Sequence, residues 1–168
     1  MTDEGFRDFV RMRYMDLLRT AYLLTGTWPN AEDLVQIALM KAMRNWSRID
    51  DPMAYLRRAL ANQRATIWSR MRRQPLPVGK LPDHPDSRDL AESVAQRDEL
   101  LRALAGLPPR MRAVLVLRYW EDLSEADTAG ILGCSIGSVK SQASRGLAQL
   151  RSVLAGSRTP VGGSFDVG

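Results

Sequence analysis

Apolar residues recur at helical spacing along most of this chain, and almost no segment alternates apolar and polar residues with the period of a β-strand. Near the N-terminus, Leu17, Ala21 and Leu24 return every three or four residues until Gly26 interrupts the pattern. Residues three and four apart share one face of an α-helix, and glycine commonly ends a helix. We therefore expect an all-α fold whose first helix ends near Gly26.

Six further segments show the same spacing and carry signals for helix ends. Helices are expected over about 29–46, 52–73, 96–105, 109–120, 125–132 and 136–154. Ser124 with Asp127 resembles a capping box, and Ser135 can cap the last helix. Gly133 between these two helices predicts a tight turn, so the segment has the form of a helix-turn-helix.

A cluster of prolines divides the chain. Pro75, Pro77, Pro82 and Pro85 lie close together, and each lacks a backbone N–H and disfavours a helix before it. This pattern predicts two small helical domains, over 1–74 and 96–155, joined by a Pro-rich linker over 75–95. The composition of residues 156–168 predicts a disordered tail.

Charge and composition narrow the function. The 168 residues carry a formal net charge of +5, which favours a polyanionic partner such as nucleic acid. One cysteine and one histidine cannot supply a typical zinc site, so we expect no metal and no cofactor. No P-loop and no paired nucleophile and base stand out, so we expect neither an enzyme nor a small-molecule substrate. The N-terminus carries acidic residues rather than a secretory signal, which predicts a cytoplasmic location.

The last predicted helix has two different faces. Its expected core side consists of apolar residues: Ile136, Val139, Ala143, Leu147, Leu150 and Leu154. The opposite side carries small hydroxyls and cations, which suit close approach to a DNA major groove: Ser138, Lys140, Ser141, Ser144 and Arg145. An ordinary solvated helix face is the alternative.

The third predicted helix belongs to a stretch without acids. From Pro52 to Pro82 the chain has no Asp or Glu but several arginines, which repel one another unless a polyanion is bound. Leu56, Ala59, Leu60 and Ile67 share its expected inward side. The outward side combines an aromatic ring, a cation and polar groups: Tyr55, Arg58, Asn62 and Ser69. Such a surface suits an unstacked base, and a solvated Arg-rich face is the alternative.

The second predicted helix carries a mixed outer surface. Val35, Leu39, Ala42 and Trp46 form its expected inward side. The other side places apolar residues among polar and charged ones: Asp33, Gln36, Ile37, Met40 and Arg44. Apolar groups rimmed by polar ones are typical of a protein interface, and scattered exposed apolar residues are the alternative.

Four short motifs resemble those of one family. Ala31-Glu32-Asp33-Leu34-Val35-Gln36 is similar to A-x-D-L-x-Q, and Tyr55-Leu56 with Ala61-Asn62 is similar to an aromatic-Leu and A-x-N pattern. Leu107-Pro108 with Arg112 resembles L-P-x-x-x-R, and Gly137-Ser138-Val139-Lys140-Ser141 resembles G-[ST]-V-K-[ST]. Their order and spacing resemble the sigma-70 family of RNA polymerase sigma factors, in its extracytoplasmic-function (ECF) group of the actinobacterial sigma-E type. Ile37, Thr66, Asp127 and Gln142 depart from the family's usual residues.

This resemblance implies a sigma factor with promoter DNA and core RNA polymerase as partners, the polymerase through its β′ clamp helices and β flap. It implies an anti-sigma protein as a further candidate partner. The residues implied for polymerase binding are Asp33, Gln36, Ile37, Met40 and Arg44. Those implied for the −10 element are Tyr55, Arg58, Asn62, Arg64 and Ser69. Those implied for the −35 element are Ser135, Ser138, Lys140, Ser141, Ser144 and Arg145. A regulator that uses only the helix-turn-helix is the alternative function.

Overall fold

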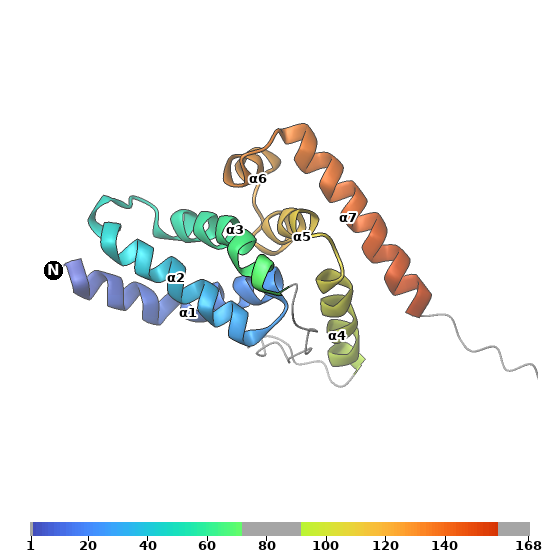
Figure 1. The fold of residues 1–168 in the computed structure, drawn as a ribbon, viewed down its shortest axis with the longest axis horizontal. Coiled ribbons are helices and arrows are strands. Elements are labelled where there is room, and N and C mark those ends of the chain that lie inside the picture. The colour runs from blue at the N-terminus through green and yellow to red at the C-terminus, as the bar shows by residue number, and fades with distance from the viewer. Residues whose placement is uncertain (1, 72–91, 158–168) are drawn as a thin grey trace, which may run out of the picture.

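The computed structural model describes residues 2–71 and 92–157, with side chains for 3–62 and 95–156. The described residues form α-helices joined by short turns (Figure 1). The elements are α1 Thr2–Thr25, α2 Trp28–Asn45, η1 Trp46–Arg48, α3 Pro52–Met71, α4 Glu92–Ala105, α5 Pro109–Leu115, η2 Val116–Trp120, α6 Glu125–Leu132 and α7 Ile136–Ser157. The described part of the chain is thus all-α, as its periodicity predicts.

The first three helices pack around one apolar core. Leu17 on α1, Leu34 on α2 and Leu56 on α3 are almost completely buried within the same cluster. α1 ends where predicted because Gly26 has a φ of 83°, and its N–H donates to the Tyr22 carbonyl at 2.7 Å. Spacing of apolar residues therefore sets which side of each helix faces inward.

The second core lies among α5, α6 and α7. Met111 and Leu115 on α5 and Val139 and Ala143 on α7 are buried in it. α7 approaches α5 closely at Gly146, where a Cβ atom would lie 2.9 Å from side-chain carbons of α5. Only a residue without a side chain allows this helix contact.

The two halves of the described chain, α1–α3 and α4–α7, pack against each other. Leu101, Ala113 and Val116 of the second half belong to the core cluster of the first half. Arg112 on α5 is only 1% exposed, and its Nη1 donates to the Leu24 carbonyl of α1 at 3.1 Å. In Figure 1, α6 lies next to α3, while α7 lies farther out. The sequence predicted two joined domains but not this contact.

Several predicted boundaries need correction. α4 begins at Glu92 rather than residue 96, so the last predicted linker residues, 92–95, are helical. α7 continues to Ser157, so the expected disordered tail is wrong for residues 156–157. The expected 109–120 helix changes at Val116 into a π-helical turn, where the Glu121 N–H donates to the Val116 carbonyl five residues back. The rest of the predicted linker and tail, 75–91 and 158–168, lies outside the described residues.

Candidate nucleic-acid and protein interfaces

α6, the turn and α7 form the predicted helix-turn-helix. The Ser124 hydroxyl accepts from the Asp127 N–H at 3.0 Å, and the Ser135 hydroxyl accepts from the Ser138 N–H at 3.0 Å. Each hydroxyl thus satisfies a donor that the first turn of a helix leaves free. Gly133, with a φ of 65°, makes the turn between them in the left-handed region that glycine adopts without strain.

The predicted reading face of α7 is open to solvent. Its hydroxyls and cations are all exposed: Ser138, Lys140, Ser141, Ser144 and Arg145. On the opposite side Val139 and Ala143 are buried, and Leu147 and Leu150 pack against the core. The core prediction is wrong for Ile136, which is 46% exposed because it lies in the first turn of α7. Ser135 is also exposed, but its hydroxyl already holds the first turn.

Glu125 on α6 links two cations near this face. Its carboxylate lies 3.7 Å from Nζ of Lys140 and 4.0 Å from Nη2 of Arg118. The Lys140 side chain is 66% exposed, so water screens this pair and it contributes little stability. Lys140 can therefore leave Glu125 for a phosphate at small cost.

The predicted base-binding side of α3 faces the second half rather than open solvent alone. Arg58 and Asn62 are exposed and Tyr55 is half-buried. Tyr55 and Arg58 line a groove of about 560 Å³ whose other wall includes Asp127 and Ile131 of α6. Arg64 and Ser69, also predicted for this surface, have side chains outside the described residues. The two halves therefore enclose part of this surface between them.

The outer side of α2 is accessible. Asp33, Gln36, Met40 and Arg44 are exposed, Met40 to 51%, and Ile37 is partly exposed. Val35 and Ala42 are buried, while Leu39 and Trp46 pack partly buried against the core, as predicted. In Figure 1, α3 and α5 lie between α2 and α7. The structure thus brings Asp33, Gln36, Met40 and Arg44 to one surface and separates that surface from α7.

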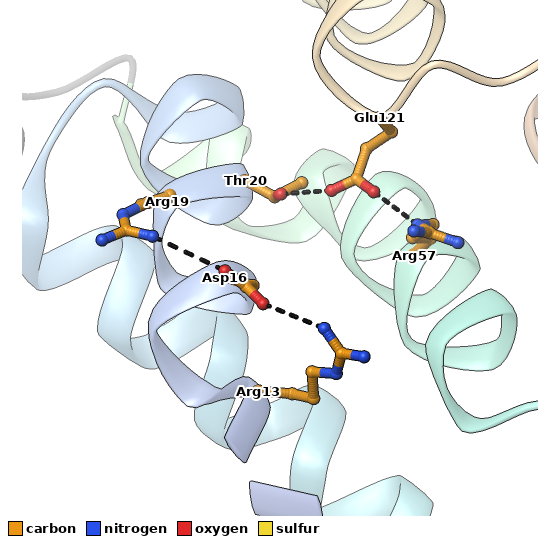
Figure 2. A network of polar contacts seen from close by, with 6 residues as sticks. All are labelled: Arg13, Asp16, Arg19, Thr20, Arg57 and Glu121. Carbon is orange, nitrogen blue, oxygen red and sulfur yellow. Dashed lines mark hydrogen bonds and ion pairs between the residues drawn. The ribbon is translucent and has the colours of Figure 1, made fainter. Parts of the chain in front are cut away.

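A polar contact that the sequence did not reveal joins the halves (Figure 2). The Glu121 carboxylate, whose side chain is 10% exposed, accepts from the Thr20 hydroxyl of α1 and from Nε of Arg57 on α3. Nearby, Asp16 pairs with Arg13 and Arg19, which belong to its own helix. Of the two acids in this network, Glu121 is therefore the one that connects the second half of the chain to the first. We call its bonds to Thr20 and Arg57 the Glu121 contact.

The exposed faces were predicted from the sequence, whereas the residues that join the two halves were not. Arg112 was named only as part of the L-P-x-x-x-R motif. A single arginine within the apolar run 111–117 is, however, itself a signal for a buried cation. No comparable signal marks Glu121, because its partner Thr20 lies 101 residues away in sequence. Such contacts depend on the tertiary arrangement.

Within residues 3–62 and 95–156, no group of three or more His, Cys, Asp or Glu side chains gathers in a way that could hold a metal ion. No helix in the described part of the chain is both long and apolar enough to cross a bilayer.

Comparisons with known proteins match both halves. Residues 9–74 match the model of Sigma-70 region 2, and residues 97–150 match that of Sigma-70 region 4. The chain is 40% identical to the RNA polymerase sigma-E factor of Streptomyces coelicolor over 152 residues, which cover 89% of this chain and 85% of the relative. It is 32% identical to the ECF RNA polymerase sigma factor SigM of Mycobacterium tuberculosis, over 89% of this chain and 77% of that protein.

A solved structure agrees with these matches. It is the sigma factor RpoE of Bartonella quintana in complex with the anti-sigma factor NepR, with a TM-score of 0.66 and 27% identity, covering 89% of this chain and 98% of that chain. A regulator made of a helix-turn-helix alone leaves the region 2 match unexplained, so that alternative is wrong. The chain therefore belongs to the sigma-70 family and is an RNA polymerase sigma factor of its ECF group.

Proposed function

We propose that the three faces described above divide the work of this sigma factor. The outer side of α2 binds core RNA polymerase at the β′ clamp helices, α3 holds the −10 element, and α7 reads the −35 element. The observation that carries this proposal is that α2 in the first half and α7 in the second half each expose their predicted polar residues over buried apolar sides. One chain can therefore contact polymerase and DNA at once.

At α7, specificity comes from side chains that reach base edges. Arg145 can donate two hydrogen bonds to a guanine, and the small hydroxyls of Ser138 and Ser141 allow the helix to enter the major groove. The N-terminal end of α7 adds a partial positive charge for phosphates. Phosphate contacts set the position of the helix, and base contacts set the sequence that it prefers.

At α3, the proposed role is capture of an unstacked base. Stacking on an aromatic ring such as Tyr55 stabilises a flipped base by about 1–3 kcal/mol, which offsets the few kcal/mol that unstacking costs. Arg58 and Asn62 lie exposed on the same helix and can contact the backbone and the base edge. The sigma factor thereby stabilises the open promoter, and the polymerase supplies the chemistry of RNA synthesis.

The roles of the two domains, the cellular location and an anti-sigma partner also form part of this proposal. We assign residues 1–74 to polymerase binding and the −10 element, and residues 96–155 to the −35 element and the β flap. Transcription places the protein in the cytoplasm. The related Bartonella quintana sigma factor binds an anti-sigma factor, and we propose that a protein of this class also restrains this chain.

The assignment of α7 is tested with two arginines of one helix. Arg145→Ala should weaken binding to the preferred duplex by about 1–3 kcal/mol and relax base preference at one position. Arg151 is also exposed on α7 but is not part of the proposed face, so Arg151→Ala is the matched control. Binding is measured by fluorescence anisotropy on the preferred and on a scrambled duplex. Equal losses on both duplexes would show that Arg145 does not read a base.

A further inference from the structure

An acid lies beside the proposed reading face of α7. Glu125 is the first residue of α6, and its carboxylate lies 3.7 Å from Nζ of Lys140. Lys140 is one of the two cations proposed for that face, and Arg145 is the other. A negative charge beside Lys140 opposes DNA binding, because the DNA backbone is itself negative. Glu125 therefore does something other than raise the affinity of α7 for DNA.

Glu125 is held in place from the side away from Lys140. Nη2 of Arg118 lies 4.0 Å from its carboxylate, and the Arg118 side chain is 24% exposed. Arg118 is itself fixed, since its Nη1 donates to the Leu123 carbonyl and its guanidinium lies 5.7 Å from the centre of the Tyr119 ring. The N-terminal end of α6 also favours a negative charge. The carboxylate thus keeps its surroundings whether or not Lys140 is beside it.

Lys140 is the movable partner of this pair. Its side chain is 66% exposed, against 35% for that of Glu125. Water screens such an ion pair, so the pair is weak. It nevertheless keeps the ammonium group near Glu125 when nothing better is offered. A phosphate draws Lys140 away only if it lies close to the ammonium group and stays there.

Promoter and non-promoter DNA differ in how firmly they offer that phosphate. Binding to non-promoter DNA rests on phosphate contacts alone, without base contacts that fix the depth and register of a helix. On a promoter, base contacts from residues such as Ser141 and Arg145 would fix α7 in the groove and hold one phosphate beside Lys140. An unfavourable charge that acts mainly against the wrong partner increases specificity. Glu125 has this effect if it retains Lys140 on non-promoter DNA only.

From these observations we propose that Glu125 is a specificity-determining residue of the α7 surface. It retains Lys140 on non-promoter DNA and releases it to a phosphate where base contacts fix the helix. Glu125 thereby lowers the affinity for the many wrong sites more than the affinity for the promoter. The proposal rests on the role of α7 in the proposed function.

The proposal is tested first by removing the acid. The full chain binds two duplexes, one selected by the parent chain from a random-sequence pool and a scrambled version of it, and fluorescence anisotropy measures both affinities. Glu125→Gln should raise affinity for the scrambled duplex by about fivefold and for the selected duplex by less than about twofold. On the scrambled duplex the slope of log affinity against log salt should steepen by about 0.9, the value for one phosphate contact.

Asp127→Asn is the matched control. Asp127 is an exposed acid on the same helix, and its carboxylate pairs with no cation among the described side chains. Loss of its charge should change both affinities by the same factor. Thermal unfolding followed by circular dichroism checks that each variant is folded.

A double-mutant cycle then tests whether Glu125 acts through Lys140. In the parent chain, Lys140→Gln should weaken binding to the scrambled duplex by less than about twofold, because Glu125 already retains the ammonium group. In the Glu125→Gln chain the same change should weaken it by about fivefold, because Lys140 is then free to contact phosphate. Equal effects in the two chains would show that the side chains act independently, and the proposal would fail.

The binding measurements separate this proposal from the role of α7 itself. If the parent chain prefers the selected duplex but Glu125→Gln leaves the ratio of the two affinities unchanged, Glu125 does not determine specificity and α7 keeps its role. If Asp127→Asn lowers that ratio as much as Glu125→Gln does, the effect is one of net charge and the proposal is wrong. If selection yields no duplex that the parent chain prefers, α7 does not read sequence, and both proposals fail.

Discussion

Arg112 on α5 donates from Nη1 to the backbone carbonyl of Leu24 on α1, 88 residues away, at 3.1 Å. Its Nη2 donates to the carbonyls of Ala105 and Leu107, at the end of α4. The last carbonyls of a helix lack partners within the helix and carry its partial negative charge, so one buried cation stabilises the ends of two helices. Arg112 thereby fixes the second half on the first.

Replacement of Arg112 should be strongly destabilising. Arg112→Met removes hydrogen bonds to three carbonyls, of which those to Leu24 and Leu107 are buried, so we expect the free energy of unfolding to fall by about 3 kcal/mol or more. Arg110 is the exposed neighbour, and Arg110→Met should change stability by less than about 0.5 kcal/mol. Urea unfolding followed by circular dichroism measures both. Equal losses in the two variants would contradict this role of Arg112.

Two helical glycines should respond in opposite directions to alanine. At Gly146 a Cβ atom would lie 2.9 Å from carbons of Met111 and Leu115, so Gly146→Ala should destabilise the fold by about 1–3 kcal/mol. At Gly130 no heavy atom lies within 4 Å of the added Cβ, so Gly130→Ala should stabilise α6 by about 0.5–1 kcal/mol. Thermal unfolding compares them. A stabilising Gly146→Ala would show that α5 and α7 do not approach this closely.

The cap of α6 gives a smaller prediction. Ser124→Ala removes the oxygen that accepts from the Asp127 N–H, and we expect a loss of about 1 kcal/mol in unfolding free energy. Ser124→Asp keeps an acceptor at the helix N-terminus and should restore the stability of the parent chain. If the aspartate variant is as unstable as the alanine variant, the hydroxyl of Ser124 does not act as the cap.

The sequence predicted the local features of this structure well, for a physical reason. Gly26 and Gly133 end helices because their backbones take positive φ, and Ser124 accepts the bond of a capping residue within three positions. Apolar spacing placed Val139 in the core correctly. Each of these outcomes depends on neighbours along the chain, and such neighbours are visible in a sequence.

Apart from the start of α4, the end of α7 and the π-helical turn at Val116, the errors concern tertiary position. Ile136 has the spacing of a core residue, but the first turn of α7 leaves it exposed. Arg112 and Leu24 lie 88 residues apart in the sequence, and Glu121 and Thr20 lie 101 residues apart. No local sequence pattern can therefore predict these two hydrogen bonds. The faces of α2 and α7 could be predicted because they are exposed sides of regular helices. The partial covering of α3 could not, since it follows from those long-range contacts.

The most direct test of the central claim is promoter-specific transcription. The purified chain is mixed with bacterial core RNA polymerase and a genomic promoter library, and RNA start sites are sequenced. We expect co-elution with the polymerase and initiation at promoters that share −10 and −35 sequences. Asp33→Ala and Gln36→Ala should weaken both, whereas Asp8→Ala, an exposed acid on α1, should not. Tight duplex binding without polymerase binding or initiation would contradict the account.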